Sequence, residues 1–427
     1  MRKYLQNEAV RKNCHILGML EAHASEKHLS FHTPGHKIAG YDITELSYSD
    51  NLSCPSGVIL QAEKDVATIL GAEASFLLTD GSTAGVLSML YALKLRGCQK
   101  IAAPVLSHKS FYNGCALLQL TPVVFETPTK ALPLPLFARD VEEALSEADA
   151  LFLTSPDYYG NVADLQGIRA LCALQGKPFI VDGAHGGHLH YNKELYAGAY
   201  ADMWVDGVHK SLPAFTQGAV VSASKGFASE LKTAVDTFRT TSPSYPIMAS
   251  VEYAVKYPRN DGLERLVNAV KQSNGCFYQN ADYTKLCVFA KDGFALERLA
   301  QQQGIYPEFS QENLVCFYLS PAQEEEEVEQ LLDFLSTMRQ EGRLLEGKEV
   351  DSIPAPIKLC DIQGKETEKV AVCEAVGRIS ASVCGLFPPC LPLIRKGEKI
   401  TKEAITALQV ASNRFGVENN QITVVKE

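Results

Sequence analysis

The chain has 427 residues, of which 46% are hydrophobic and 21% are charged, and its 40 Lys and Arg against 50 Asp and Glu give a formal net charge of −10. These values are ordinary for a globular protein and exclude a disordered or collagen-like chain. The negative charge argues against nucleic-acid binding through the overall field, and no run approaches 18 apolar residues, so no membrane span is expected. The 12 cysteines form no Cys-x-x-Cys pair, so we expect reduced thiols in a cytoplasmic protein.

The first half of the chain alternates between helical and extended patterns. Residues 1–30 have a helical apolar stripe, residues 31–57 form an arm rich in proline and glycine, and helical spacing returns at Ile59. Short apolar runs then predict strands at Phe76–Thr79, Lys100–Ala103, Val123–Glu126, Ala150–Thr154, Phe179–Asp182, Met203–Val205 and Gly218–Ser222. Helical patterns such as Val86–Leu95 and Val141–Ala148 lie between them. This alternation predicts an α/β fold with a mostly parallel sheet flanked by helices.

The composition changes after residues 257–262. Gln323–Arg343 reads as an amphipathic helix with an acidic, solvated face, and residues from about 295 onward resemble a smaller α+β domain. We therefore expect an N-terminal helix and arm over 1–57, a large domain over 58–290 and a small C-terminal domain over 291–427.

Polar residues follow five of the predicted strands, where open α/β sheets bind ligands. These segments are Asp80–Gly85, Ser107–Ser110, Ser155–Gly160, Asp182–His185 and Asp206–Ser211. Gly81, Ser82 and Thr83 at a strand-to-helix turn can bind a phosphate through backbone N–H groups and the helix dipole. The same residues also suit an ordinary helix N-cap.

Two charged residues have surroundings that suggest chemistry. Asp182 ends a run that reads as a buried strand, where a carboxylate needs a partner, although a turn Asp is also common before glycine. Lys210 lies among apolar residues, and a lysine so placed can form a Schiff base, whereas most lysines are simply exposed. His108 is either a loop histidine or a flat ring that stacks on a planar cofactor.

Together these parts suit pyridoxal 5′-phosphate. The lysine would hold the aldehyde, the aspartate would keep the pyridine nitrogen protonated, and the ring would accept electrons.

With these residues in hand, the sequence resembles the ornithine/lysine/arginine decarboxylases, pyridoxal-phosphate enzymes of fold type I, from about Leu29 to about Ile400. The matching segments are Phe31–His36, Asp80–Gly85, Ser107–Ser110, Val181–Gly186, His209-Lys210, Thr241–Tyr245, Gly304–Glu308, and Glu374–Ala381 followed by Phe387–Pro389. The resemblance implies a seven-stranded-type sheet and a short form without the N-terminal wing domain of longer members.

The resemblance also implies a role for each matched residue. Lys210 would be the Schiff-base lysine, Asp182 would be the partner of the ring nitrogen, and His108 would be the stacking ring. His185 would lie near the phenolic oxygen, and Glu308 would pair with the substrate's distal cation. The phosphate site would consist of Gly81, Ser82, Thr83 and His209. Because the family builds its sites at a dimer interface, His36 in the arm is expected near substrate in a homodimer or an oligomer of dimers. The implied reaction is decarboxylation of lysine, ornithine or arginine to an amine and CO2.

Some positions depart from the family pattern, and other functions stay open. Gly207 replaces a phosphate-binding serine, Ser53 replaces a histidine, Cys390 a glycine, and Asn161 a small apolar residue. Another fold type I enzyme, such as an aminotransferase or lyase, would share Lys210 and Asp182, and a degenerate homologue would bind cofactor without turnover. A metal-dependent hydrolase would instead use Asp182, His185, His188 and His190 as ligands.

Overall fold

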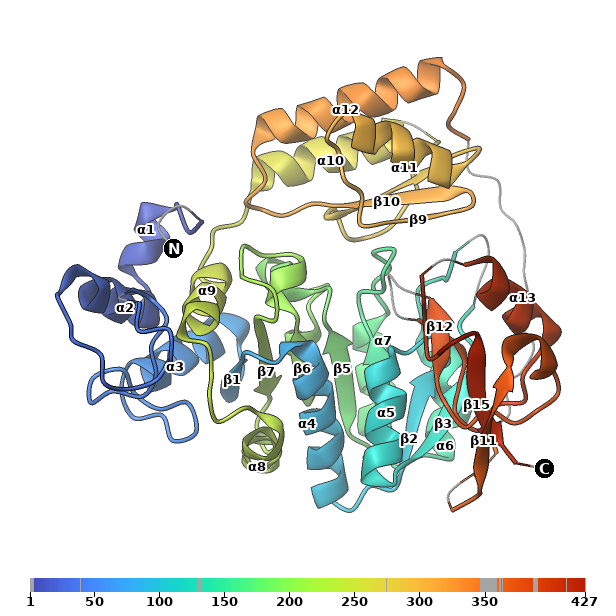
Figure 1. Cartoon of the computed structure of the whole chain (residues 1–427), viewed down its shortest axis with the longest axis horizontal. Coiled ribbons are helices and arrows are strands. Elements are labelled where there is room, and N and C mark those ends of the chain that lie inside the picture. Colours follow the sequence, from blue (N-terminus) through green and yellow to red (C-terminus); the bar gives the residue numbers. More distant parts are fainter. Residues whose placement is uncertain are drawn as a thin grey trace.

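A computed structural model describes residues 4–38, 40–128, 132–273, 275–345, 359–360, 362, 364–386, 391–411 and 413–426. Its centre is a seven-stranded sheet, with two short N-terminal helices at one end, a smaller helix-covered sheet above it and a C-terminal group of strands at the other end (Figure 1).

The central sheet has the order β1-β7-β6-β5-β4-β2-β3. Its strands are β1 (Ala74–Leu78), β2 (Lys100–Pro104), β3 (Thr121–Phe125), β4 (Ala150–Thr154), β5 (Phe179–Gly183), β6 (Met203–Asp206) and β7 (Ala219–Ala223). All neighbours pair in parallel except β7, which runs antiparallel to both β1 and β6. The predicted α/β fold with a mostly parallel sheet flanked by helices is confirmed.

Both faces of this sheet are buried, so alternate residues of one strand enter two different cores. In β4, Leu151 and Leu153 belong to one core, whereas Phe152 belongs to the other. The first core is covered by α3 (Val58–Leu70), α6 (Ala138–Ser146), α7 (Leu165–Leu174) and α9 (Tyr245–Val255). The second is covered by α4 (Gly81–Leu95), α5 (Lys109–Leu118) and α8 (Ala228–Phe238), the helices in front in Figure 1.

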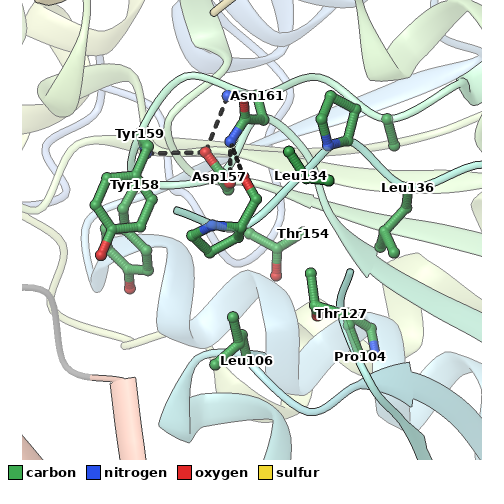
Figure 2. Close-up of a pocket in the computed structure, with 13 residues that line it drawn as sticks. Pro104, Leu106, Thr127, Leu134, Leu136, Thr154, Asp157, Tyr158, Tyr159 and Asn161 are labelled. Atoms are coloured by element: carbon green, nitrogen blue, oxygen red, sulfur yellow. Dashed lines mark hydrogen bonds between the residues drawn. The ribbon is translucent and has the colours of Figure 1, made fainter. Parts of the chain in front are cut away.

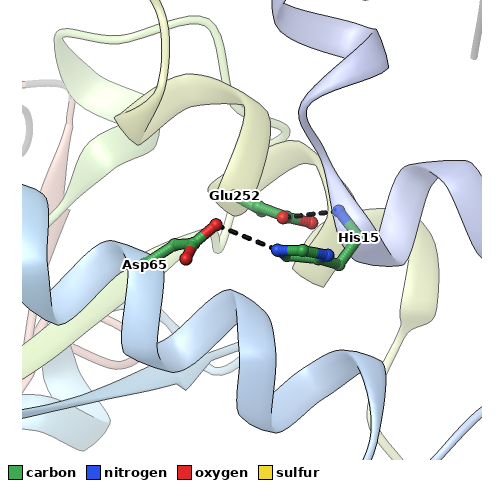
Figure 3. A group of neighbouring side chains, drawn as sticks. All are labelled: His15, Asp65 and Glu252. Carbon is green, nitrogen blue, oxygen red and sulfur yellow. Dashed lines mark hydrogen bonds and ion pairs between the residues drawn. The ribbon is translucent and has the colours of Figure 1, made fainter.

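The N-terminal helix expected over residues 1–30 is instead two helices, α1 (Glu8–Lys12) and α2 (His15–Ser25). The break arises because the Glu252 carboxylate on α9 accepts hydrogen bonds from His15 N at 2.6 Å and Ile16 N at 2.9 Å, which starts a new helix at His15 (Figure 3). His15 Nε2 also lies 2.9 Å from Asp65 Oδ2. The ammonium of Lys256 contacts both carboxylates, at 2.6 and 2.9 Å, so this cluster is an ion-pair anchor.

A second, three-stranded antiparallel sheet has the order β8-β10-β9. It consists of β8 (Lys285–Phe289), β9 (Phe309–Gln311) and β10 (Leu314–Tyr318), covered by α10 (Asp261–Ser273), α11 (Gly293–Gln302) and α12 (Glu325–Gln340). The helix predicted over Gln323–Arg343 is present as α12, with three glutamates in its first turn. β8 lies before residue 290, yet it pairs with β10, which lies after that residue. The boundary between a large and a small domain at residue 290 stays a prediction.

The C-terminal segment packs beside the carboxyl end of β2. Its elements are β11 (Thr367–Ala371), β12 (Cys384–Leu386), β13 (Leu391–Ile394), α13 (Lys402–Val410), β14 (Arg414–Phe415) and β15 (Gln421–Val425). The buried Arg395 guanidinium donates to Val105 O at 3.2 Å, which joins this segment to the loop after β2. Among the described residues, no helix combines the length and the hydropathy that a bilayer crossing requires.

Candidate active site

The carboxyl ends of six strands, all but β7, meet at the edge of the central sheet that faces the second sheet. A short helix, Val208–Lys210, follows β6 at this edge. It places Lys210 Nζ 3.2 Å from Nε2 of His185, which follows β5. The structure therefore brings together two of the residues that the sequence singled out.

His185 is almost fully enclosed, and burial followed by the nearby charge of Lys210 lowers its pKa well below the ordinary value. Its ring packs edge-on against Tyr158 and Tyr318, with centroids 4.7 and 5.6 Å away. The neutral ring that accepts from Lys210 at Nε2 carries its proton on Nδ1. That atom is buried without a hydrogen-bond partner in the described part of the chain, so the site offers an unused donor to an acceptor such as a phenolic oxygen.

Asp182 is a buried carboxylate at the end of β5. Among the described residues it accepts one hydrogen bond, from Ala184 N at 3.1 Å. Burial raises its pKa, and the positive charge of Lys210 opposes that rise. A carboxylate with so few donors is costly unless a cation joins it, and a protonated pyridine nitrogen has the required charge.

His108 follows β2 and caps α5. Its Nδ1 accepts a hydrogen bond from Ser110 N at 3.2 Å and lies 2.8 Å from the Ser110 hydroxyl. Burial, followed by the charges of Lys210 and Lys109, lowers its pKa to about 3. The ring is therefore neutral at physiological pH and held at a fixed angle, as a stacking partner for a flat cofactor must be.

The turn between β1 and α4 has the geometry of a phosphate site. Gly81 has a φ of +73°, and, its neighbours in the chain aside, no atom of the described residues lies within 4 Å of the position that a Cβ would take. The hydroxyls of Ser82 and Thr83 follow at the positive end of α4, and neither is hydrogen-bonded to any residue of the described ranges. His209 donates from Nδ1 to Gly218 O at 2.9 Å, so its Nε2 could donate to an anion once the ring takes up a second proton.

Gly207, which replaces a family serine, is explained by close backbone contact. A Cβ at this position would lie 2.5 Å from Ala184 O, nearer than real Cβ atoms come to backbone oxygen. The local path of β5 and β6 therefore excludes any side chain at residue 207. Without a hydroxyl at residue 207, the predicted phosphate ligands that remain are Gly81, Ser82, Thr83 and His209.

The two predicted substrate residues are both exposed. His36 is exposed in the N-terminal arm, where its Nε2 lies 3.0 Å from Asp42 Oδ2. Glu308 is exposed beside the second sheet, and its negative charge contributes to the raised pKa of Tyr318, whose ring packs against His185. Ser53 is exposed in the arm, and Cys390 and Phe387–Pro389 lie outside the described residues.

Comparison with known proteins identifies the family. The model of the family described as "Orn/Lys/Arg decarboxylase, major domain" matches residues 38–288, more than half of the chain. The chain belongs to this family. The prediction of a pyridoxal-phosphate-dependent decarboxylase of fold type I is therefore confirmed.

Relatives and solved structures agree with the family over nearly the whole chain. An arginine decarboxylase of Halalkalibacterium halodurans is 27% identical over 93% of this chain and 92% of its own. An uncharacterized protein of Bacillus subtilis, YaaO, is 28% identical over 96% of both chains. The crystal structure of the Francisella novicida lysine decarboxylase LdcF is 16% identical, with a TM-score of 0.75 over 96% of this chain and 81% of that one.

The metal hydrolase considered from the sequence is wrong for this decarboxylase. Its three histidines diverge: His185 contacts Lys210, His188 Nε2 lies 2.8 Å from Asp282 Oδ1, and His190 donates to Gly187 O. They cannot share one ion with Asp182. In the described ranges, three possible metal-ligand atoms come close together at His15, Asp65 and Glu252. This group is the ion-pair anchor that Lys256 contacts.

Sequence reasoning missed a small cavity that this decarboxylase has beside the site. It has a volume of about 50 Å³ and lies between the ends of β2 and β4 and the segment 133–136, with Leu106, Thr154 and Tyr158 in its wall (Figure 2). Asp157 at its rim accepts from Asn161 N at 2.9 Å and Asn161 Nδ2 at 2.8 Å. Burial raises the pKa of Asp157 to about 6. Asn161 thus holds the loop that carries Tyr158. No local sequence motif predicts its pairing with Asp157.

Proposed function

We propose that the protein decarboxylates a basic amino acid, one of arginine, lysine and ornithine, to the corresponding amine and CO2. The observation that carries this proposal is the arrangement around Lys210. Its Nζ contacts a neutral, buried His185, and Asp182, a buried carboxylate, lies near enough for its charge to interact with that of Lys210. Relatives named arginine decarboxylase and neighbours titled lysine decarboxylase support a basic substrate.

The bound cofactor supplies an electron sink for the α-carbon. Asp182 would hold a proton on the pyridine nitrogen, His108 would lie against the ring, and Ser82, Thr83 and His209 would bind the phosphate. Lys210 would bind the cofactor at Nζ and, once released by substrate, would return a proton from Nζ to the α-carbon. His185 Nε2, 3.2 Å away, would accept a hydrogen bond from Nζ and so hold the amine in place.

We further propose that a second copy of this chain covers the N-terminal arm. The side chains of Leu29, Phe31 and Ile38 are 81%, 94% and 73% exposed, which is unusual for large apolar residues close together. A homodimer would bury them and bring His36 toward a neighbouring site. The described cysteines are free thiols and mostly buried, which supports a cytoplasmic location.

Product analysis tests the function. With arginine, lysine and ornithine supplied separately to the cofactor-loaded enzyme, one of them is expected to yield CO2 and its amine in equal amounts. A keto acid without CO2 would indicate an aminotransferase. A protein with the cofactor's absorbance but no product from any of the three would be a degenerate homologue, and the proposal would be abandoned.

Glu308→Gln tests recognition of the substrate's distal cation. If the exposed carboxylate beside Tyr318 pairs with that cation, the variant loses a charge-assisted contact and kcat/KM falls by about ten-fold or more. Cofactor absorbance should not change. Glu312→Gln, on the same sheet, serves as the matched control. Equal kinetics for Glu308→Gln and wild type would leave the cation's partner on another residue.

A further inference from the structure

A buried ion cluster joins the segment after β5 to the second sheet, and the proposed reaction does not use it. Asp282, with no exposed side-chain surface, lies 2.8 Å from His188 Nε2 and 3.4 Å from Lys285 Nζ. The Thr284 hydroxyl donates to Asp282 Oδ1 at 2.7 Å and accepts from Lys285 Nζ at 2.9 Å. A fully buried lysine is costly unless it is paired, and Asp282 and Thr284 pair this one.

Lys285 faces the candidate active site through one aromatic ring. Its Nζ lies 4.4 Å from the centre of the Tyr318 ring, within cation–π distance. The same ring meets His185 edge-on, with centroids 5.6 Å apart and planes at 88°. The Tyr318 hydroxyl donates to Tyr158 O at 2.7 Å. The buried ammonium thus holds the ring that forms one wall of the His185 pocket.

The charges around His185 come from three directions. Lys210 lies 3.2 Å away after β6, His108 follows β2, and Lys285 with Asp282 lies at the start of β8; Tyr158 and Tyr318 close the remaining sides as uncharged rings. Lys210 and Lys285 disfavour a proton on His185, and Asp282 favours one. His108, with a pKa of about 3, adds to the repulsion only at strongly acidic pH.

We propose that Lys285 is a positioning residue, whose buried ammonium fixes Tyr318 against His185 and keeps the Lys210–His185 pair from gaining a further positive charge. This inference rests on the proposed function of that pair. The competing explanation is a cluster that only ties the second sheet to the central one.

The test is the visible spectrum of the cofactor-loaded enzyme as a function of pH, compared between Lys285→Met and wild type. Removing a positive charge makes protonation beside Lys210 easier, so the spectral titration midpoint should move up by about one pH unit. Asp282→Asn removes the opposing negative charge and should move it down. A cluster that only ties the sheets together would lower thermal stability in both variants without moving the midpoint.

Lys271→Met is the matched control. Lys271 is another buried lysine of the same region, whose Nζ donates to Asn280 Oδ1 at 2.7 Å and to Asp282 O at 2.8 Å, and it is not among the main charges that act on His185. Its loss should destabilise the protein and leave the midpoint in place. If Lys285→Met fails to fold, two other variants decide the question. Asp282→Asn should lower the midpoint, and Lys285→Arg, which keeps the charge, should keep the wild-type midpoint. A midpoint unchanged in all of these variants would overturn the inference, whereas a protein that never acquires cofactor absorbance would instead overturn the proposed function.

Discussion

Replacement of Lys210 by alanine should abolish turnover, with kcat falling by at least about three orders of magnitude, while the protein stays folded. The expectation follows because Lys210 Nζ is the amine held beside His185, and no buffer amine is equally oriented. The fold should survive because Lys210 is only half-buried and its backbone hydrogen bond to Gly207 O does not need the side chain. CO2 release and far-UV circular dichroism measure the two effects.

Covalent labelling identifies the lysine directly. Borohydride reduction of the loaded enzyme, followed by peptide mapping, should place the pyridoxyl group on Lys210. Lys225→Ala, which removes an exposed lysine of the same domain, should keep both the label and the activity. A label on Lys109 or Lys225 would transfer the role to that residue and end the assignment to Lys210.

Asp182→Asn should lower kcat by about two orders of magnitude or more, equivalent to about 3 kcal/mol. The substitution keeps the shape of the side chain but removes the charge that would hold a proton on the pyridine nitrogen, so the ring would accept electrons poorly. Cofactor can still bind through Lys210 and the phosphate. A variant with near wild-type kcat would reject this role for Asp182.

The same substitution should make the stability of the cofactor-free protein less dependent on pH. Burial raises the pKa of Asp182 above its ordinary value of 3.8, so the folded state holds the proton more tightly than the unfolded state does. Stability from this group is therefore present at acidic pH and declines as pH rises above about 4. The amide that replaces the carboxyl group has no proton to lose in this range, so thermal unfolding of the Asp182→Asn protein should show a weaker decline between acidic and neutral pH.

The sheet and the chemistry at its edge could be predicted because both depend on local pattern. The apolar run Ala150–Thr154 is β4 with the same bounds. His108 and Lys210 closely follow predicted strands, and Asp182 ends one. Parallel strands carry such residues to a common edge. Even the departure at Gly207 was visible in the sequence, although its cause, the approach of Ala184 O, needed coordinates.

What could not be predicted depends on residues far apart in the chain. His188 and Asp282 are separated by 94 residues, and Lys285 begins a strand whose sequence gives no sign that its ammonium is buried. The single N-terminal helix was wrong for the same reason, because the carboxylate that starts α2 belongs to residue 252. Three histidines within six residues suggested one metal ion, but each side chain follows its own backbone direction to a different partner.

The anchoring of α2 also bears on how the protein is made. His15 and its partner Glu252 are 237 residues apart, and the apolar face of α2, Ile16, Leu17 and Leu20, is fully covered in the finished fold. A ribosome adds roughly 5–20 residues per second, so these side chains leave the exit tunnel roughly 10–50 s before α9 exists to receive them. During that interval the nascent N-terminus exposes the apolar face of α2, which a holding chaperone would recognise. A tag added at the N-terminus would be exposed together with this segment.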